Sequence, residues 1–353
     1  MTRKRADDGG CADNTTGIIL SPEIETPHIF PENCCMAPTF YLAPLRGVTD
    51  VVFRTAFERR FGRFDFMLAP FVTTVKGREV ARSHLRDLTG EENDRTRLVP
   101  QILGNDPDDF LLIARDLHTL GYRTINLNLG CPHPQVTKKR RGSGMLPFAD
   151  FLFSFLTKVF SGLPDSCSLS VKVRLGLEDG DELARLMPLL NDFPLCEVII
   201  HPRTGKQMYE GTIDTERFAA CAAACRHPVV YNGDILTPGD LHRYEQLFPS
   251  INRWMVGRGM AYTPTLLAAL RSGSVPEVDF TMLREFHDEL FERNRTILFG
   301  PSHLLGKMKE FWRYFSCNFP SGHNILKSIQ RCSTTENYLR HVERAFGSSG
   351  NGI

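Results

Sequence analysis

Eight short apolar segments recur between residues 39 and 259, and most of them end in glycine, proline, asparagine or a charged residue. Short apolar runs without polar alternation are typical of strands that are buried on both faces of a sheet. The segments are TFYLAP (39–44), FMLAPFV (66–72), LVPQILG (98–104), TINLNLG (124–130), SVKVRLG (170–176), EVIIHPR (197–203), PVVYNGD (228–234) and RWMVGRG (253–259). Because most intervals between them have the spacing of amphipathic helices, strand and helix are predicted to alternate.

Alternating strands and helices allow either a closed (β/α)8 barrel or an open doubly wound sheet. Eight strands within about 220 residues favour the barrel. No GxGxxG motif follows the first strand, which removes the usual dinucleotide signature of the open sheet. We therefore predict an α/β protein with a (β/α)8 TIM barrel over residues 38–275.

The two flanks of the repeat differ from it in composition. Residues 1–37 are polar and rich in proline, and we expect a flexible N-terminal extension. Apolar residues at spacings of three and four continue over 276–347, which predicts a small C-terminal helical domain. From residue 280 onward, ten Lys or Arg outnumber seven Asp or Glu, a modest basic bias. Residues 348–353 form a short Gly/Ser tail.

The overall composition excludes several classes of protein. The 42 Lys and Arg against 41 Asp and Glu give a net charge of +1, so any nucleic-acid-binding surface is a local patch. The N-terminus lacks the apolar core of a secretory signal, and no stretch approaches the ~18 apolar residues of a membrane span. The ten cysteines are scattered without a CxxC pair, which indicates reduced thiols. We expect a cytoplasmic monomer without a membrane or metal partner.

Polar side chains gather where the predicted strands end. In a (β/α)8 barrel the carboxyl ends of all strands form one face, and active sites lie there. This clustering is the strongest physical signal for function in the sequence. The residues concerned are Gln101, Asn128, Cys131, Lys172, His201, Arg203, Asn232, Asp234 and Arg258.

Cys131 lies in a Gly–Cys–Pro turn after the fourth strand. A thiol at such a rim can act as a nucleophile, a general acid or a metal ligand, although most cysteines are small buried apolar residues. The next segment contains Lys138, Lys139, Arg140 and Arg141, followed by Gly–Ser–Gly. Such a run is either an ordinary solvated loop or a mobile basic loop that binds a polyanion.

Anion-binding signals follow the fifth, seventh and eighth strands. Lys172 and Arg174 lie two apart on one strand and point the same way, and a Lys inside a barrel needs an anion or water unless it pairs with a neighbouring acid. Asn232–Gly233–Asp234 and Gly257–Arg258–Gly259 end the last two strands, where barrels commonly bind phosphate. An Arg at that point offers two donors to a phosphate group.

Together these pieces resemble the dihydrouridine synthase family, flavin enzymes that reduce uridine in tRNA. The resemblance covers about residues 40–262, and the LGKMKEFWRYF stretch resembles the helical domain that follows the barrel in that family. The matching pieces are LAPLRGVTD, PQILG, NLNLGCPHPQVTKKRRGSGML, SVKVRLG, HPRTGKQMYEG, NGDI and VGRGM.

The resemblance implies roles for the matching positions. Cys131 corresponds to the general acid that protonates uracil carbon 5 after hydride has passed from reduced flavin mononucleotide (FMN) to carbon 6, and NADPH or NADH re-reduces the flavin. The implied FMN-binding residues are Pro44, Leu45, Gln101, Lys172, His201, Asn232, Gly233, Asp234, Gly257 and Arg258. The residues expected to contact the substrate or the RNA backbone are Asn128, Lys138, Lys139, Arg140, Arg141, Arg203 and Lys206, together with the helical domain.

Two positions depart from the family pattern, since Asn126 stands where Asp is frequent and Pro202 where Gly is frequent. We expect neither to touch the acid or the FMN-binding residues. Two other functions are considered beside uridine reduction. One is a different FMN barrel, similar to dihydroorotate dehydrogenase, that acts on a small molecule. The other is an RNA-binding protein without catalytic activity. The sequence leaves open which uridine, and which RNA, is the substrate.

Overall fold

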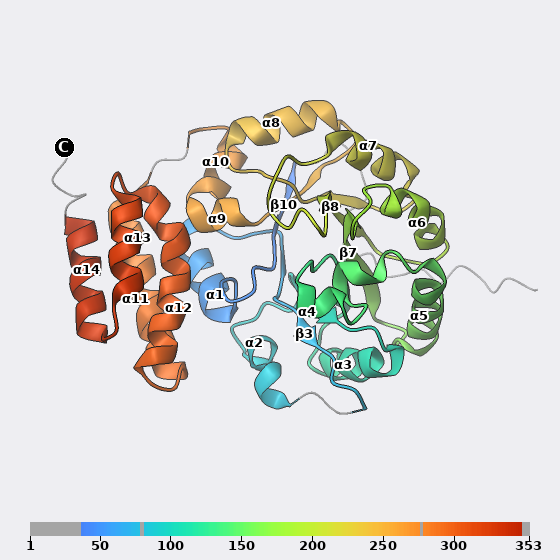
Figure 1. The fold of residues 1–353 in the computed structure, drawn as a ribbon, viewed down its shortest axis with the longest axis horizontal. Coiled ribbons are helices and arrows are strands. Elements are labelled where there is room, and N and C mark those ends of the chain that lie inside the picture. The colour runs from blue at the N-terminus through green and yellow to red at the C-terminus, as the bar shows by residue number, and fades with distance from the viewer. Residues whose placement is uncertain (1–36, 78–80, 276–277, 348–353) are drawn as a thin grey trace, which may run out of the picture.

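The computed structural model describes residues 37–77, 81–275 and 278–347 (Figure 1). Apart from Ala37, the extension predicted over 1–37 lies outside the described residues, as does the tail predicted over 348–353. Within these ranges the chain forms one parallel sheet with helices around it, and four further helices at one side.

Every strand pairing in the sheet is parallel, in the order β3-β5-β6-β7-β8-β9-β10-β1-β2-β4. β4 and β5 are separated only by Pro100 and together form one barrel strand, and β2 and β3 belong to the preceding one. The pairings β2–β4 and β3–β5 therefore join the same two barrel strands, which closes the sheet into a barrel. The segments are β1 (Thr39–Leu42), β2 (Phe66–Leu68), β3 (Val72–Thr73), β4 (Leu98–Val99), β5 (Gln101–Leu103), β6 (Thr124–Leu129), β7 (Ser168–Gly176), β8 (Val198–Thr204), β9 (Val229–Tyr231) and β10 (Arg253–Val256). Each of the eight predicted apolar segments contains a strand, and the predicted barrel is confirmed.

Helices surround the sheet as the sequence predicted (Figure 1). Thr237 and Asp240 form a capping box at the start of α8, where Pro238 takes the first helical position. The carboxylate of Asp106 caps α3 by accepting from two backbone N–H groups. The helices of this layer are α1 (Val51–Phe61), α2 (Arg86–Thr89), α3 (Pro107–Thr119), α4 (Pro134–Thr137), α5 (Ala149–Gly162), α6 (Glu182–Asn191), α7 (Thr215–Ala224), α8 (Pro238–Leu247), α9 (Arg258–Tyr262) and α10 (Leu266–Ser272).

The segment between β3 and β4 is the least regular unit of the barrel, and α2 is only four residues long. A buried side chain of α1 holds it. The Arg54 guanidinium donates to the Asp87 carboxylate at 2.9 Å and to the Asn93 side chain at 2.9 Å. The Arg54 charge is fully buried and paired with these two side chains. These contacts attach the polar segment between β3 and β4 to the barrel, although it contains no long amphipathic helix.

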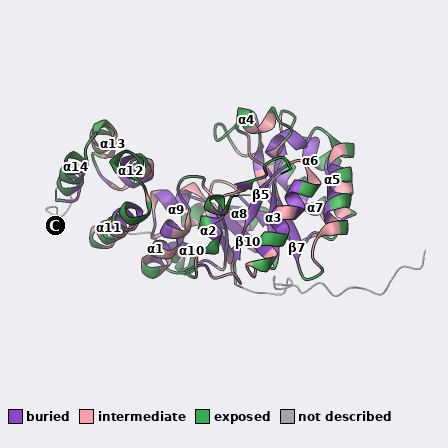
Figure 2. Ribbon diagram, turned by 90° about the horizontal axis from the view of Figure 1, so that it is seen from below, coloured by how far each residue is buried: buried purple, intermediate pink, exposed green. Residues whose placement is uncertain are grey.

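Four helices follow the barrel and lie beside it in Figure 2; the first two contact α1, and the last two pack on the second and on each other. Phe53 of α1 stacks on Phe311 with ring centroids 5.9 Å apart and contacts Phe286 edge-on at 5.5 Å. Arg59 and Arg60 of α1 form ion pairs with Glu289. The helices are α11 (Phe280–Ile297), α12 (Pro301–Phe315), α13 (Gly322–Arg331) and α14 (Thr335–Gly347).

Among the described residues, no single helix has both the length and the apolar character needed to span a membrane. The segments Pro134–Met145 and Ala149–Gly162 meet the length and composition criteria only as a pair, across a bend of 77°.

A buried polar network connects three of the C-terminal helices. The Trp312 indole N–H donates to the Tyr338 hydroxyl at 2.9 Å, and that hydroxyl lies 2.6 Å from His287 Nε2. Since the Tyr338 oxygen accepts from Trp312, its own proton points to His287 Nε2, and the imidazole proton is on Nδ1, which faces Asp288 at 2.8 Å. Burial lowers the pKa of His287, so the folded state holds this imidazole neutral.

This network predicts a loss of stability on acidification. Below about pH 6.5 the unfolded chain binds a proton at His287 that the folded chain excludes, so the free energy of unfolding falls as pH drops through that value. Urea denaturation near pH 7.5 and near pH 5.5 measures the effect. We expect His287→Gln to lose less of its free energy of unfolding than the wild type between the two pH values. Equal losses would show that His287 titrates alike in both states.

Candidate functional site

The carboxyl ends of the strands surround a cavity with two adjoining lobes. Six residues line both lobes, namely Pro44, Leu45, Lys172, His201, Tyr209 and Arg258. The inner lobe continues along Asn232, Gly233, Asp234 and Gly257, and the outer lobe, about 370 Å³ in volume, along Gln101, Asn128, Cys131, Arg174 and Tyr314. All ten predicted FMN-binding residues and Cys131 therefore border one continuous cavity.

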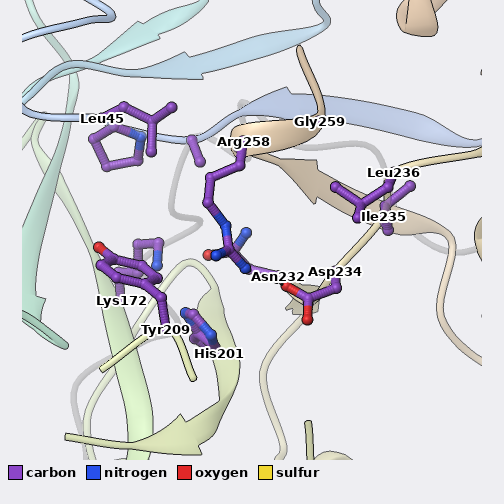
Figure 3. Close-up of a pocket in the computed structure, with 14 residues that line it drawn as sticks. Leu45, Lys172, His201, Tyr209, Asn232, Asp234, Ile235, Leu236, Arg258 and Gly259 are labelled. Atoms are coloured by element: carbon purple, nitrogen blue, oxygen red, sulfur yellow. Dashed lines mark hydrogen bonds and ion pairs between the residues drawn. The ribbon is translucent and has the colours of Figure 1, made fainter. Parts of the chain in front are cut away.

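Arg258 and the Asp234 carboxylate lie at one end of the inner lobe, 2.6 Å apart (Figure 3). Arg203 of β8 lies outside the lining and contacts the same carboxylate at 2.5 Å. Burial alone raises the pKa of Asp234, but the hydrogen bond from Arg203 and the charges of Arg203 and Arg258 outweigh it and lower the pKa. Asp234 therefore stays ionised and fixes the Arg258 guanidinium at the cavity wall, where it can bind a phosphate group.

Lys172 supplies an ammonium group at the centre of the cavity. No hydrogen bond or ion pair joins Lys172 to another residue in the described part of the chain. Burial, and next the charge of Arg174, lower the pKa of Lys172 to about 7. A buried lysine without a hydrogen-bond partner, close to the Arg174 cation, indicates a place for an anionic group of a ligand.

His201 lies beside Lys172 and the Tyr209 ring (Figure 3). Burial lowers the pKa of His201 well below its ordinary value, and the charges of Arg174, Lys172 and Arg203 lower it further. An Arg203 N–H lies 3.3 Å from His201 Nε2, and a guanidinium only donates, so the imidazole is neutral with its proton on Nδ1. His201 can therefore donate one hydrogen bond without adding charge.

Cys131 follows β6 in a turn that several backbone contacts fix. The Asn128 Oδ1 atom accepts from the backbone N–H groups of Gly130 at 3.0 Å and Cys131 at 2.8 Å. Gly142 has a φ of +57°, and a Cβ there would lie 2.6 Å from the Cys131 carbonyl oxygen, so glycine is required. Ser143 donates to that oxygen through both its N–H and its hydroxyl.

The protonation state of Cys131 follows from its surroundings. Burial raises the pKa of the thiol, and a backbone hydrogen bond from His133 and nearby cations offset this only in part. The group is therefore a protonated thiol at neutral pH. A thiol in this state suits a proton donor, whereas a nucleophile or a metal ligand would need the thiolate.

A family model described as Dihydrouridine synthase (Dus) matches residues 41–316. This chain belongs to the dihydrouridine synthase family. A relative named tRNA-dihydrouridine(16) synthase, from Neisseria meningitidis serogroup B, is 25% identical over 87% of this chain and 95% of its own length. Another of that name, from Pseudomonas putida, is 27% identical over the same shares. A tRNA-dihydrouridine synthase B from Pasteurella multocida is 27% identical over 66% of this chain and 68% of its own length.

Solved structures share the fold at low sequence identity. A 2-naphthoyl-CoA reductase complex has a TM-score of 0.52 at 12% identity, over 67% of this chain and 50% of its own. Histamine dehydrogenase from Rhizobium sp. 4-9 has a TM-score of 0.51 at 9% identity, over 67% of this chain and 46% of its own.

Three residues that line this cavity were given no site role by the family resemblance, although Arg174 was noted beside Lys172 as an anion-binding signal. Arg174 donates to the Gly130 carbonyl at 3.0 Å and to the Thr204 carbonyl at 2.7 Å, which ties the Cys131 turn to the loop after β8. The guanidinium groups of Arg174 and Arg258 each contact the ring of Tyr209, in that loop, at 5.4 and 5.2 Å from its centroid. Tyr209 could have been predicted, because it lies in the segment HPRTGKQMYEG that matches the family. Tyr314 comes from α12, and no local pattern could place it there.

The predicted basic loop is attached to the barrel through one of its four cations. Lys138, Lys139 and Arg140 are exposed, but the Arg141 guanidinium donates to Asn105 Oδ1 at 2.9 Å and to the Thr74 carbonyl at 3.2 Å. Arg141 therefore anchors the loop to the barrel instead of facing solvent. The exposed part of the loop is the three residues before it.

Arg203 and Lys206, both predicted to contact RNA, differ in their exposure to solvent. Arg203 is buried, with Asp234 and the carbonyl oxygens of Glu210 and Gly211 as partners, so it cannot reach an RNA backbone in this conformation. Lys206 is exposed, with Glu178 at 2.8 Å. Among the described residues, no group of three His, Cys, Asp or Glu side chains could hold a metal ion.

The protonated state of Cys131 can be tested without cofactor or substrate. Iodoacetamide reacts with the thiolate, so the alkylation rate of the Cys131 peptide against pH reports its pKa. We expect its midpoint to lie above the ordinary thiol value, because burial raises the pKa. The exposed thiol of Cys317 in the same protein is the internal reference. A Cys131 midpoint below the ordinary value would mean a thiolate and contradict the proton-donor assignment.

Proposed function

We propose that this chain is a flavin-dependent tRNA-dihydrouridine synthase, which reduces uridine in tRNA to 5,6-dihydrouridine. The observation that carries the proposal is the pairing of a protonated Cys131 thiol with a cation-lined cavity that contains the unpaired Lys172. FMN fits this donor set, because it combines a phosphate with a ring that becomes anionic when reduced. The family and the names of the relatives support the same reaction.

The two ends of the cofactor would contact different residues of the cavity. Arg258, held by Asp234, and the backbone at Gly257 would bind the phosphate. Lys172 would face the ring, where its charge favours the reduced form, and neutral His201 would donate a hydrogen bond nearby. When bound, the flavin supplies a hydride to carbon 6 of the uracil ring. We propose NADPH as the reductant that restores it.

Cys131 would complete the reaction on the substrate. Addition of hydride at carbon 6 leaves negative charge at carbon 5, and the thiol of Cys131 transfers its proton there. Afterwards the thiolate recovers a proton from solvent. The raised pKa of Cys131 keeps the proton in place until that charge develops. The target base has to leave its stack to enter the cavity, which costs a few kcal/mol.

The test is nucleoside mass analysis of bulk tRNA that lacks dihydrouridine, after incubation with this protein, FMN and NADPH. We expect a uridine derivative two hydrogens heavier from the wild type. Cys131→Ala should retain its flavin and oxidise NADPH, yet form dihydrouridine at least about a hundredfold more slowly, because the general acid is gone. Since relatives are named for position 16, that position is mapped first.

Either of two results would contradict this proposal. A wild-type protein with reducible flavin but no product would favour an FMN oxidoreductase of small molecules. Normal turnover by Cys131→Ala would remove the thiol from the reaction.

The exposed cations of the basic loop give a separate prediction for RNA binding. Replacing Lys138, Lys139 and Arg140 by Gln should weaken tRNA binding and reduce the slope of log affinity against log salt by up to about 2 to 3, if each contacts one phosphate. Filter binding at several salt concentrations measures both. The matched control replaces Lys158, Arg185 and Arg226, three exposed cations of the outer layer. An unchanged slope in the loop variant would place the RNA elsewhere.

A further inference from the structure

A directional chain of hydrogen bonds runs beneath the catalytic turn inside the barrel. It begins at the backbone N–H groups of Gly130 and Cys131, which both donate to Asn128 Oδ1. The Asn128 amide N–H donates in turn to Gln101 Oε1 at 2.7 Å. Gln101 and Asn128 line the cavity, so the two amides connect the Cys131 turn with the cavity wall.

Asn126 continues this chain away from the cavity. The Gln101 Nε2 atom donates to Asn126 Oδ1 at 2.7 Å, and Asn126 Nδ2 donates to the Ser170 hydroxyl at 2.8 Å. That hydroxyl lies 3.5 Å from the Ile125 carbonyl oxygen, to which it donates. Register supports the chain, because Gln101 and Ser170 are the residues opposite Asn126 on the two neighbouring strands.

Only one orientation of the three side-chain amides pairs every donor in this chain of hydrogen bonds with an acceptor. A backbone N–H only donates, so the turn requires an oxygen from Asn128, which leaves the Asn128 N–H for Gln101. Gln101 must then present oxygen to Asn128 and N–H to Asn126. Rotating any one amide by half a turn would set N–H against N–H, or oxygen against oxygen, in a buried site.

Asn126 itself touches neither the cavity nor the turn. It is fully buried and absent from the cavity lining, whereas Gln101 and Asn128 border the cavity. The expectation that Asn126 would not touch the FMN-binding residues is wrong, because its side-chain oxygen accepts from Gln101. Any influence of Asn126 on the reaction therefore acts through the two other amides.

We propose that Asn126 is a positioning residue, which fixes the amide orientation of Gln101 and, through Asn128, the turn that carries Cys131. The functional part of this inference rests on the proposed uridine reduction. The structural part concerns only the chain of hydrogen bonds, and it can be measured at the thiol without cofactor.

Two substitutions at residue 126 separate hydrogen bonding from packing. Asn126→Leu keeps the approximate volume but leaves the Gln101 N–H without its acceptor. Asn126→Asp keeps an oxygen for Gln101, and the Ser170 hydroxyl can rotate to donate to the second carboxylate oxygen. The matched control is Thr124→Val, a buried polar residue on the same face of β6 whose hydroxyl has no hydrogen-bond partner in the described chain.

The expected results differ among these variants. Asn126→Leu should lower kcat for dihydrouridine formation roughly tenfold or more, with KM for tRNA unchanged, because a buried donor is left unsatisfied. In flavin-free protein, alkylation of the Cys131 peptide near neutral pH should become several-fold faster, because the loosened turn admits water. Asn126→Asp should restore both values to near wild type, and Thr124→Val should leave both unchanged.

Three outcomes would overturn the inference. These are wild-type kcat and alkylation in Asn126→Leu, an Asn126→Asp variant as impaired as the Leu variant, and an equal defect in Thr124→Val. If Asn126→Leu does not fold, Ser170→Ala removes the acceptor of the Asn126 N–H and should change both values in the same direction. If the wild type reduces no tRNA, the proposed function fails, and the alkylation comparison still decides the role of Asn126.

Discussion

The concentration of positive charge at the mouth of the barrel is the constraint on which the site depends. Lys172, Arg174 and Arg258 border one cavity, and Asp234 is the one carboxylate among its described lining residues. Asp234 offsets Arg258 and Arg203, and carbonyl oxygens satisfy Arg174, but Lys172 has no such partner. Burial, and next these charges, lower the pKa of His201 and keep it neutral. An anionic group of a ligand would offset the unpaired charge of Lys172, so the electrostatics of the cavity favour binding of an anion.

One of the four C-terminal helices, α12, contributes to the cavity. Tyr314 of α12 borders the outer lobe, and Lys307 of the same helix donates to the Gly47 carbonyl at 2.7 Å and contacts Asp50 at 2.5 Å. Those two residues belong to the loop that begins with Pro44 and Leu45. Helix α12 therefore supports one wall of the cavity through side-chain contacts between segments about 260 residues apart in the chain.

The fold was predictable from the sequence, because eight apolar segments and their helical intervals are local patterns. The polar residues of the cavity were predictable for the same reason, since strand ends in a barrel share one face, whereas Pro44 and Leu45 came only from the family resemblance. What the sequence did not reveal depends on tertiary contacts. Three features each need a partner from another element. Arg203 is buried against Asp234, Arg141 is anchored by Asn105, and Tyr314 reaches the cavity from α12. The contact of Asn126 with Gln101 was missed because a register between strands, and not a motif, creates it.

The most direct measurement of the central claim is a single turnover without free reductant. Protein with reduced flavin, freed of NADPH and kept anaerobic, is mixed with tRNA that lacks dihydrouridine, while flavin absorbance and nucleosides are followed together. The account predicts that oxidised flavin returns in step with dihydrouridine, one for each flavin. Flavin that stays reduced in the presence of this tRNA would contradict it.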